Sequence, residues 1–171
     1  MISPFPDDVS GPHFRTGLGV DAHAFSQDEN RQMWLAGLHW PDEIGVDAHS
    51  DGDVVAHAMC DALFSAAGLG DLGTNFGIER PEYRAASGTR LLAEVLQQIT
   101  AAGYRVSNVS VQIIGNHPKL GSRRADATAV LSAALGGAEV SISATTTDGL
   151  GFTGEGKGIA AIATALIYKF F

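Results

Sequence analysis

Residues Asp53 to Ala67 read DVVAHAMCDALFSAA, the clearest helical pattern in the chain. Ser50 or Asp51 can cap the start of this segment, and Gly68 and Gly70 follow its end. The apolar residues recur every three or four positions, the spacing of one face of an α-helix: Val54, Ala58, Met59, Ala62, Leu63 and Ala66. We therefore expect one helix over the whole segment.

Strand patterns stand on both sides of this helix. Val106 to Ile114 is rich in β-branched residues, which favour a central strand, and Val140 to Thr147 alternates apolar with polar side chains. Ile159 to Tyr168 leaves two interpretations open, because its alanine content favours a helix whereas its short length and alternation permit a strand. The other expected elements are a strand at Thr16 to His23, a small strand or hairpin arm at Met33 to Trp40, and helices near Thr89 to Ala102 and Ser122 to Leu135.

The length and the order of these elements predict a single α/β domain. A chain of 171 residues, 45% of them hydrophobic, can bury one core and is too short for two comfortable ones. No internal repeat or linker interrupts the pattern. We expect a flexible tail over residues 1–15, which contain several prolines and aspartates and no long apolar run, and one domain over residues 16–171.

Charge and composition exclude several classes of partner. A net charge of −8 argues against a protein that binds nucleic acid through clustered basic residues, although a small anionic substrate fits if a metal supplies positive charge. No apolar run approaches the roughly 18 residues of a membrane span. The single cysteine, Cys60, permits no intrachain disulfide and is expected in the core, which suits a cytoplasmic protein.

A metal site is indicated by three residues on two expected elements. Asp21 and His23 are two residues apart, so on an extended segment both side chains lie on the same face. A third ligand can come from His49 or His57, and only His57 lies well inside the expected helix. A carboxylate with two imidazoles leaves one tetrahedral position open, as in catalytic zinc sites. Asp61, one turn after His57, or a neighbouring residue can orient the His57 ring.

From the residues alone, ordinary structural roles remain alternatives. Asp-x-His occurs in many loops that bind nothing. Asp51 and Asp53 can both cap a helix at its first turn, and Asp51 is at least as well suited to that role as to binding a metal. His49 can equally be a loop histidine, Thr146 a sheet threonine, and Pro118-Lys119 a solvated turn.

Four segments, taken together and in this order, resemble one enzyme family, that of 2-C-methyl-D-erythritol 2,4-cyclodiphosphate synthase. The resemblance extends from Thr16 to about Tyr168. The four segments are Gly19-Val20-Asp21-Ala22-His23, His49-Ser50-Asp51-Gly52-Asp53 with His57, Gly68-Leu69-Gly70-Asp71-Leu72-Gly73, and Ala144-Thr145-Thr146-Thr147-Asp148-Gly149-Leu150-Gly151-Phe152.

The resemblance implies a fold and a reaction. The expected fold is α/β (α+β), with a four-stranded mixed sheet covered by helices on one face, in which the last segment is a strand. Three copies are expected to form a homotrimer around a central axis, with active sites between neighbouring subunits. The implied enzyme is a phosphorus–oxygen lyase of the bacterial cytoplasm, which cyclises a cytidine diphosphate derivative of methylerythritol 2-phosphate and releases CMP in the non-mevalonate isoprenoid pathway.

The resemblance also implies a role for each matched residue. Asp21, His23 and His57 are expected to bind Zn2+, and Asp148 a Mg2+ or Mn2+ ion between the α- and β-phosphates. His49 and Thr146 are expected to contact the reacting phosphates, and His49 with Ser50 to hold the 2-phosphate end. Asp71 and Gly73 match the ribose-binding turn. Gly115 to Gly121 match the cytosine pocket, with backbone groups that contact the base and Lys119 near the phosphates. The remaining expected substrate contacts are Phe76, Leu120, Ala144, Thr145, Thr147 and Phe152.

Three positions depart from the family pattern. Gly77-Ile78-Glu79-Arg80-Pro81 follows Phe76 where the family has an acid-rich segment, so an acidic contact to the methylerythritol hydroxyls is absent at Ile78. Asp148 replaces a glutamate. Glu155 and Lys157 exchange the order of two charges, and the exchanged pair can still form a salt bridge.

Two other functions remain open on this sequence. The same three ligands can serve a zinc phosphohydrolase that uses a metal-bound water. The altered segments also fit a trimer that binds nucleotides or isoprenoid diphosphates without turnover.

Overall fold

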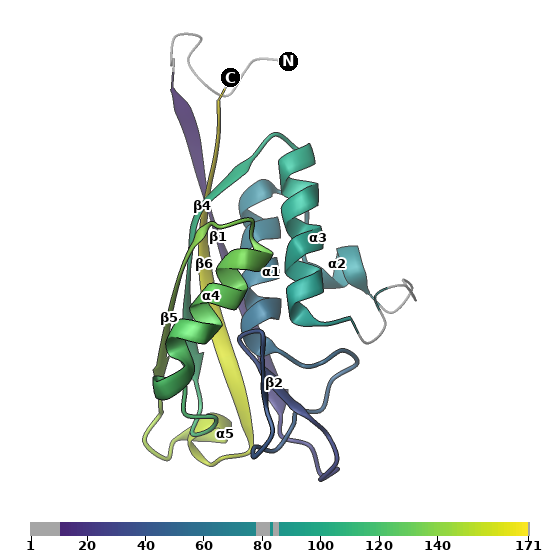
Figure 1. Ribbon diagram of the computed structural model, residues 1–171, viewed down its shortest axis with the longest axis vertical. Coiled ribbons are helices and arrows are strands. Elements are labelled where there is room, and N and C mark those ends of the chain that lie inside the picture. Colours follow the sequence, from purple (N-terminus) through teal and green to yellow (C-terminus); the bar gives the residue numbers. More distant parts are fainter. Residues whose placement is uncertain (1–10, 78–82, 84–85, 171) are drawn as a thin grey trace.

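The computed structural model describes residues 11–77, 83 and 86–170, which form one mixed sheet with its helices (Figure 1). The sheet order is β1-β6-β4-β5, with β1–β6 and β6–β4 antiparallel and β4–β5 parallel. The four strands are β1 (Pro12–Ala24), β4 (Arg105–Ile114), β5 (Glu139–Thr145) and β6 (Gly158–Phe170), and β2 (Met33–Leu35) pairs with β3 (Leu38–Trp40) in a separate hairpin. The expected α+β fold with a four-stranded mixed sheet is therefore confirmed, and the last segment, which the sequence left ambiguous, is a strand.

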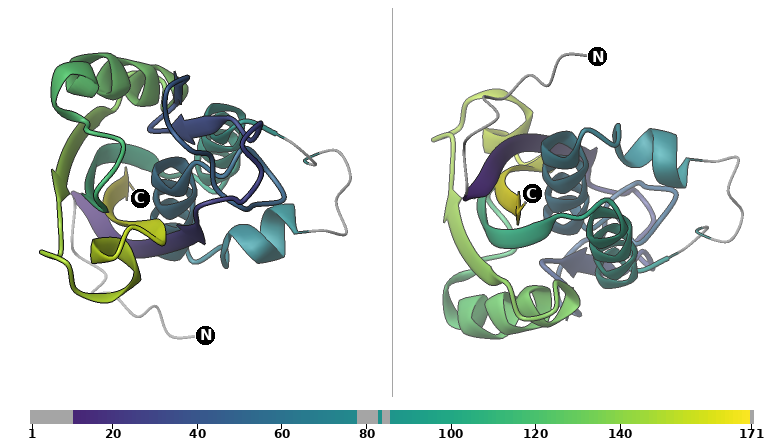
Figure 2. Two further views of the ribbon diagram at one scale, coloured as in Figure 1. Left: turned by 90° about the horizontal axis from the view of Figure 1, so that it is seen from below. Right: turned by 90° about the horizontal axis from the view of Figure 1, so that it is seen from above.

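The helices cover one face of the sheet. Helix α1 (Val54–Ala67) packs against β1 and β6, α3 (Gly88–Ala101) packs against α1, and α4 (Arg124–Ala134) contacts α3 and β5 (Figures 1 and 2). Side chains alternate accordingly along the strands: Val140 and Ile142 of β5 are buried, whereas Ser141 and Ser143 are exposed. Among the described helices, none combines the length and hydrophobicity that crossing a membrane requires.

Two glycines of β1 allow α1 to lie directly on the strand. A Cβ atom at Gly17 would lie 2.0 Å from the carbonyl oxygen of Ala62, and one at Gly19 would lie 2.0 Å from that of Ala58. The small alanines at these helix positions complete the close approach. This contact positions the site, because β1 carries Asp21 and His23 while α1 carries His57.

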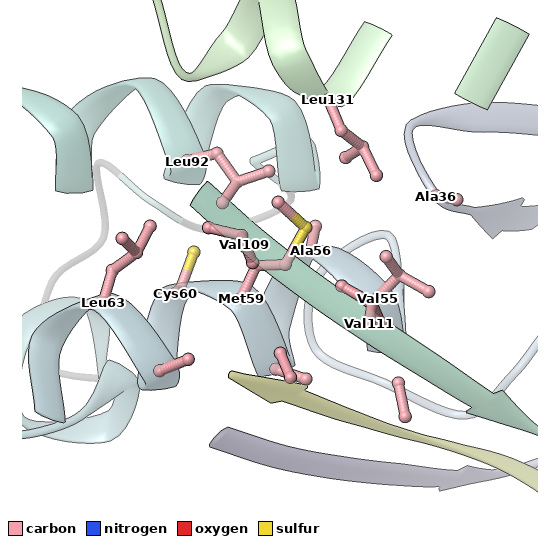
Figure 3. Packing of buried hydrophobic residues seen from close by; sticks show 14 of the residues in the cluster. Ala36, Val55, Ala56, Met59, Cys60, Leu63, Leu92, Val109, Val111 and Leu131 are labelled. Atoms are coloured by element: carbon pink, nitrogen blue, oxygen red, sulfur yellow. The ribbon is translucent and has the colours of Figure 1, made fainter. Parts of the chain in front are cut away.

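The core lies between α1, α3, α4 and the sheet. Met59 and Leu63 of α1, Leu92 of α3 and Leu131 of α4 are all fully buried in it (Figure 3). Cys60 is buried and free, as its apolar surroundings predict.

Three expectations about element ends are corrected. Asp53, and not Ser50 or Asp51, caps α1: its carboxylate accepts hydrogen bonds from the backbone N–H groups of Val55 and Ala56. The short helices α2 (Leu72–Phe76) and α5 (Gly151–Gly154) were not expected, since a single turn leaves no periodic pattern.

The third correction concerns the tail, because β1 begins at Pro12. Residues 12–15 pair with residues 167–170 of β6, so the antiparallel ladder extends the strand beyond the apolar pattern. Residues 1–10 lie outside the described residues, and the flexible tail remains a prediction there.

Candidate active site

Strand β1 and helix α1 bring the three predicted metal ligands together. Asp21 and His23 lie on one face of β1, and His57 lies in the first turns of α1. Asp21 Oδ2 is 2.9 Å from His57 Nδ1 and 3.1 Å from His23 Nε2. One ligand atom from each residue lies within 4.8 Å of the other two. The cluster contains Asp21 and His23, which the spacing places on one face of a strand, and its third member is His57 and not His49, as the family resemblance implies.

The donor set of this cluster fits a zinc ion. Zinc bound at about 2.0–2.1 Å to nitrogen and oxygen in a tetrahedron separates its ligand atoms by about 3.3 Å, close to the two measured separations. His23 Nε2 is buried and makes no hydrogen bond, although it lies near the Asp21 carboxylate. A buried polar atom without a partner is rare and destabilising, so a cation between these three groups would satisfy it.

The charges within the cluster stabilise one another. Burial raises the pKa of Asp21, but the neighbouring imidazoles of His23 and His57 outweigh burial and hold that pKa well below its usual range. Burial lowers the pKa of His57, and the Asp21 carboxylate outweighs it, so that the pKa of His57 is raised. Asp21 is therefore an anionic ligand, and a metal ion would displace a proton from the cluster.

Ser50 contacts the second ring nitrogen of His57. Its hydroxyl oxygen lies 3.0 Å from His57 Nε2. The expectation that Asp61 orients this ring is wrong, because Asp61 Oδ1 instead accepts a 2.6 Å hydrogen bond from the backbone N–H of Leu72 at the start of α2. Asp51 does not cap α1 and is not one of the three clustered residues. Its carboxylate accepts from the N–H groups of Asp53 and of Gly88 at the start of α3, and its Oδ1 lies 3.9 Å from His57 Nε2.

The metal cluster lies in a cleft of about 850 Å³. Among the described residues that line it there is no lysine or arginine. Asp61, Tyr83 and Leu91 were not predicted as substrate contacts. The spacing of Asp61 from His57 could have indicated that Asp61 lies in the cleft, whereas no sequence pattern indicates this for Tyr83 or Leu91. The lining consists of Asp21, His23, Ala48, His49, Ser50, His57, Asp61, Leu72, Gly73, Phe76, Gly77, Tyr83 and Leu91.

The predicted ribose-binding turn lies at the edge of this cleft. Asp71 is exposed and caps α2, and its Oδ1 accepts a 2.7 Å hydrogen bond from the N–H of Thr74. Hydrogen bonding to Thr74 lowers the pKa of Asp71. Gly73 and Phe76 line the cleft itself. Ile78 and the changed residues up to Pro81 lie outside the described residues.

The other predicted substrate contacts form a second group, at the carboxyl ends of β4 and β5. The Gly115 N–H donates to the carbonyl of Thr145 at 3.0 Å, and this contact joins the loop at 115–121 to the segment at 144–148. Leu120 is buried in the core. Lys119, Gly121, Ala144 and Phe152 are exposed, and Thr147 bonds within its own loop. None of the second group is among the described residues that line the cleft.

Asp148 holds an unusual backbone conformation. Its φ of 51° is left-handed, a region that aspartate and asparagine tolerate better than most other side chains. The Thr146 hydroxyl donates to Asp148 Oδ1 at 3.0 Å. Nearby, the exchanged pair Glu155 and Lys157 forms an ion pair of 2.5 Å, as its order in the sequence permits.

Comparison with known proteins agrees with this geometry over nearly the whole chain. The YgbB family model matches residues 14–168. A 2-C-methyl-D-erythritol 2,4-cyclodiphosphate synthase from Acidothermus cellulolyticus is 56% identical over 154 residues, which cover 90% of this chain and 94% of the relative. A bifunctional enzyme IspD/IspF from Clavibacter michiganensis is 56% identical over 155 residues, which cover 91% of this chain but 37% of that longer protein.

A solved structure shares the fold. An IspF of Plasmodium falciparum in complex with CDP superposes with a TM-score of 0.79 at 28% identity, covering 96% of this chain and all of the other. The chain therefore belongs to the YgbB family, the enzymes named 2-C-methyl-D-erythritol 2,4-cyclodiphosphate synthase.

Proposed function

We propose that this enzyme uses zinc to cyclise 4-diphosphocytidyl-2-C-methyl-D-erythritol 2-phosphate to 2-C-methyl-D-erythritol 2,4-cyclodiphosphate, releasing CMP. The observation that carries the proposal is the cluster of Asp21, His23 and His57 inside a cleft, in a chain whose relatives are named for this product. The lyase class, the zinc and the substrate are parts of the same proposal.

The chemistry is a phosphoryl transfer within one molecule. An oxygen of the 2-phosphate forms a bond to the β-phosphorus, and the bond between that phosphorus and the oxygen bridging to the α-phosphate breaks, so that CMP leaves with the electron pair. No proton has to be removed from an ionised phosphate, and the protein mainly orients the two phosphates in line. When bound at the three ligands, zinc would neutralise charge on the β-phosphate oxygens.

Different residues of the cleft would bind the metal, contact the phosphates and contact the carbon skeleton. Asp21, His23 and His57 would hold the zinc, and His49 and Ser50 line the cleft beside them, where they can donate hydrogen bonds to the 2-phosphate. Phe76, Leu72 and Leu91 supply an apolar wall for the carbon skeleton. Their shielding from water favours cyclisation over hydrolysis.

We propose that the second group of residues completes the cleft of a neighbouring subunit. Thr146 would contact the phosphates and Asp148 would hold Mg2+ or Mn2+, while the backbone at 115–121 would bind cytosine. The separation of this group from the cleft within one chain favours sites shared between subunits.

The open face of the sheet favours the homotrimer that such sharing requires. Phe14, Leu18, Val20 and Phe170 are each more than half exposed on β1 and β6, opposite the face that α1 covers. Exposed apolar surface of this extent is typical of an interface.

The decisive test is an assay for CMP with phosphorus NMR of the second product, before and after zinc removal. Zinc-dependent CMP release with a cyclic diphosphate is the expected result. Hydrolysis in ¹⁸O-labelled water would place the label in the product and identify a phosphohydrolase. Binding of CDP without any CMP release from the substrate would identify a binding trimer, and either of these outcomes would overturn the proposal.

A further inference from the structure

Arg31 makes an unusual set of contacts with the segment 46–50, of which Ala48, His49 and Ser50 line the cleft. Its Nε donates to the carbonyl of Val46 at 3.0 Å, and its Nη2 donates to the carbonyls of Ala48 at 3.0 Å and Ser50 at 2.5 Å. One guanidinium therefore satisfies three backbone acceptors at alternate positions. A rigid, planar fork of donors can do this, whereas the single ammonium of lysine cannot reach all three in one geometry.

The side chain of Arg31 packs closely against Gly45. A Cβ atom at Gly45 would lie 2.6 Å from Arg31 Cγ and 2.4 Å from the Arg31 carbonyl oxygen. That carbonyl accepts a 3.2 Å hydrogen bond from the Gly45 N–H. Only glycine at position 45 therefore lets the arginine stem lie against the start of the segment.

The segment that Arg31 holds is tied to the metal ligands on both sides. The Asp47 N–H donates at 2.9 Å to the carbonyl of Ala24, next to His23 at the end of β1. At its far end, the Ser50 hydroxyl lies 3.0 Å from His57 Nε2 and also accepts from the N–H of Gly52. A displacement of the Ser50 backbone would move this hydroxyl away from the ring.

The Ser50 contact matters because it concerns the ring nitrogen that does not face the cluster. When His57 Nδ1 binds a cation, the ring proton must be on Nε2, where the Ser50 hydroxyl can accept it. Partners of this kind orient a ligating imidazole and fix its tautomer, and their loss typically lowers metal affinity 10–100-fold.

We infer that Arg31 is a positioning residue for the metal site, acting through the carbonyls of segment 46–50 to hold the Ser50 hydroxyl on His57. The inference rests on the proposed zinc site and assigns Arg31 no contact with substrate. Arg31 matters to the site through Ser50, and its effect disappears when Ser50 lacks a hydroxyl.

A double-mutant cycle of Arg31→Lys and Ser50→Ala in the full chain tests this inference. Two quantities are measured: Zn2+ affinity by competition with a chromophoric chelator, and the ¹⁵N chemical shifts of the His57 ring in metal-free protein. We expect each single variant to lose about tenfold or more in affinity. The double variant should bind as weakly as Ser50→Ala alone, and Arg31→Lys should shift the His57 resonances only when Ser50 is present.

Arg123→Lys is the matched control. Arg123 is also half-buried and donates to a loop carbonyl, that of His39, at 2.6 Å, but it does not contact segment 46–50. Its substitution should leave both readouts unchanged. If Arg31→Lys does not fold, Arg31→Gln keeps the stem and two donors and enters the same cycle.

Two results would overturn the inference: full Zn2+ affinity with unchanged His57 shifts in Arg31→Lys, or equal losses from that substitution with and without the Ser50 hydroxyl. The same measurements distinguish failure of the proposed function from failure of this inference. Wild-type protein without Zn2+ affinity would refute the zinc enzyme, while the His57 shifts of metal-free protein would still decide the role of Arg31.

Discussion

A single carboxylate oxygen, Asp21 Oδ2, is shared between two imidazoles in the metal cluster. It lies 2.9 Å from His57 Nδ1 and 3.1 Å from His23 Nε2. The carboxylate is anionic, since its pKa lies well below the usual range in spite of burial. The arrangement therefore fits a cation, and in the proposed zinc site each imidazole would be a direct ligand.

Replacing His57 by alanine should abolish zinc retention and turnover while trimer assembly stays largely intact. Loss of a direct ligand should weaken zinc by more than the roughly 100-fold that removal of an outer partner costs. Metal analysis after dialysis, CMP release and light scattering check the three parts. His39→Ala, in β3 and outside the cleft, is the control and should retain zinc. A His57→Ala protein that lost zinc but kept full activity would contradict the mechanism.

Asp53 joins the start of α1 to the turn of the β2–β3 hairpin. Its Oδ1 accepts from the N–H groups of Ala36, Val55 and Ala56, and its Oδ2 accepts from that of Gly37 at 2.6 Å. The side chain is fully buried, and the hydrogen bonds from Ala36, Val55 and Ala56 are buried with it, so these three donors lose their acceptor away from water when it is removed.

Asp53→Ala should therefore destabilise the protein by at least about 2 kcal/mol, the upper end of the range for a helix cap, because the hairpin donors lose their acceptor as well. The midpoint of urea unfolding measures the loss. Asp71→Ala, which removes the cap of the exposed helix α2, should lower the midpoint much less. Equal losses in the two variants would show that the hairpin contacts contribute nothing.

At the scale of elements, the contact between β1 and α1 decides whether the metal ligands meet. The two elements approach closely only because Gly17 and Gly19 have no side chain facing the helix. His57 is carried by the helix and Asp21 by the strand, so any increase in their separation acts directly on the cluster.

Gly19→Ala should separate the two elements, because its Cβ would lie 2.0 Å from the Ala58 carbonyl oxygen and 2.5 Å from the Ala62 nitrogen. We expect a loss of about 1–3 kcal/mol in unfolding free energy from this overpacking, together with weaker Zn2+ binding. Gly11→Ala, where an added Cβ would meet nothing within 4 Å, should change neither measurement. Wild-type affinity in Gly19→Ala would mean that the strand and helix adjust without moving the ligands.

At the scale of the whole molecule, the sheet has one face covered by helices and one open face. The helical side buries the core, whereas β1 and β6 present apolar side chains on the other side. The cleft and the second group of predicted substrate contacts are separate within one chain. Both observations favour an assembly in which neighbouring copies meet at the open face.

Leu18→Asp should break this assembly, because Leu18 is 58% exposed on the open face and a buried, unpaired carboxylate there is costly. Light scattering should report a trimer for the wild-type protein and monomers for the variant, with CMP release lost and Zn2+ binding retained. Gln97→Asp, on the exposed side of α3, should remain trimeric. An intact trimer in Leu18→Asp, or a monomeric wild-type protein that is fully active, would contradict shared sites.

Much of this fold follows from local patterns in the chain. The period of apolar residues locates α1, α3, α4 and strands β4 and β5 to within a few residues, because helical and extended periodicity are properties of neighbouring residues. The same holds for Asp21 and His23, whose spacing puts them on one face of a strand. His57 is favoured over His49 as the third residue of the cluster because only His57 lies well inside the expected helix.

Contacts between residues far apart in the chain required the folded structure. Pairing with β6 extends β1 back to Pro12, where no local pattern marks a strand. Asp53 caps α1, and the turn of the hairpin supplies further donors to its carboxylate. Ser50 rather than Asp61 contacts His57, because Arg31 holds segment 46–50 against the ring. Hydrogen bonds that span 15 or more residues have no signature in local sequence, since they depend on how completed elements pack.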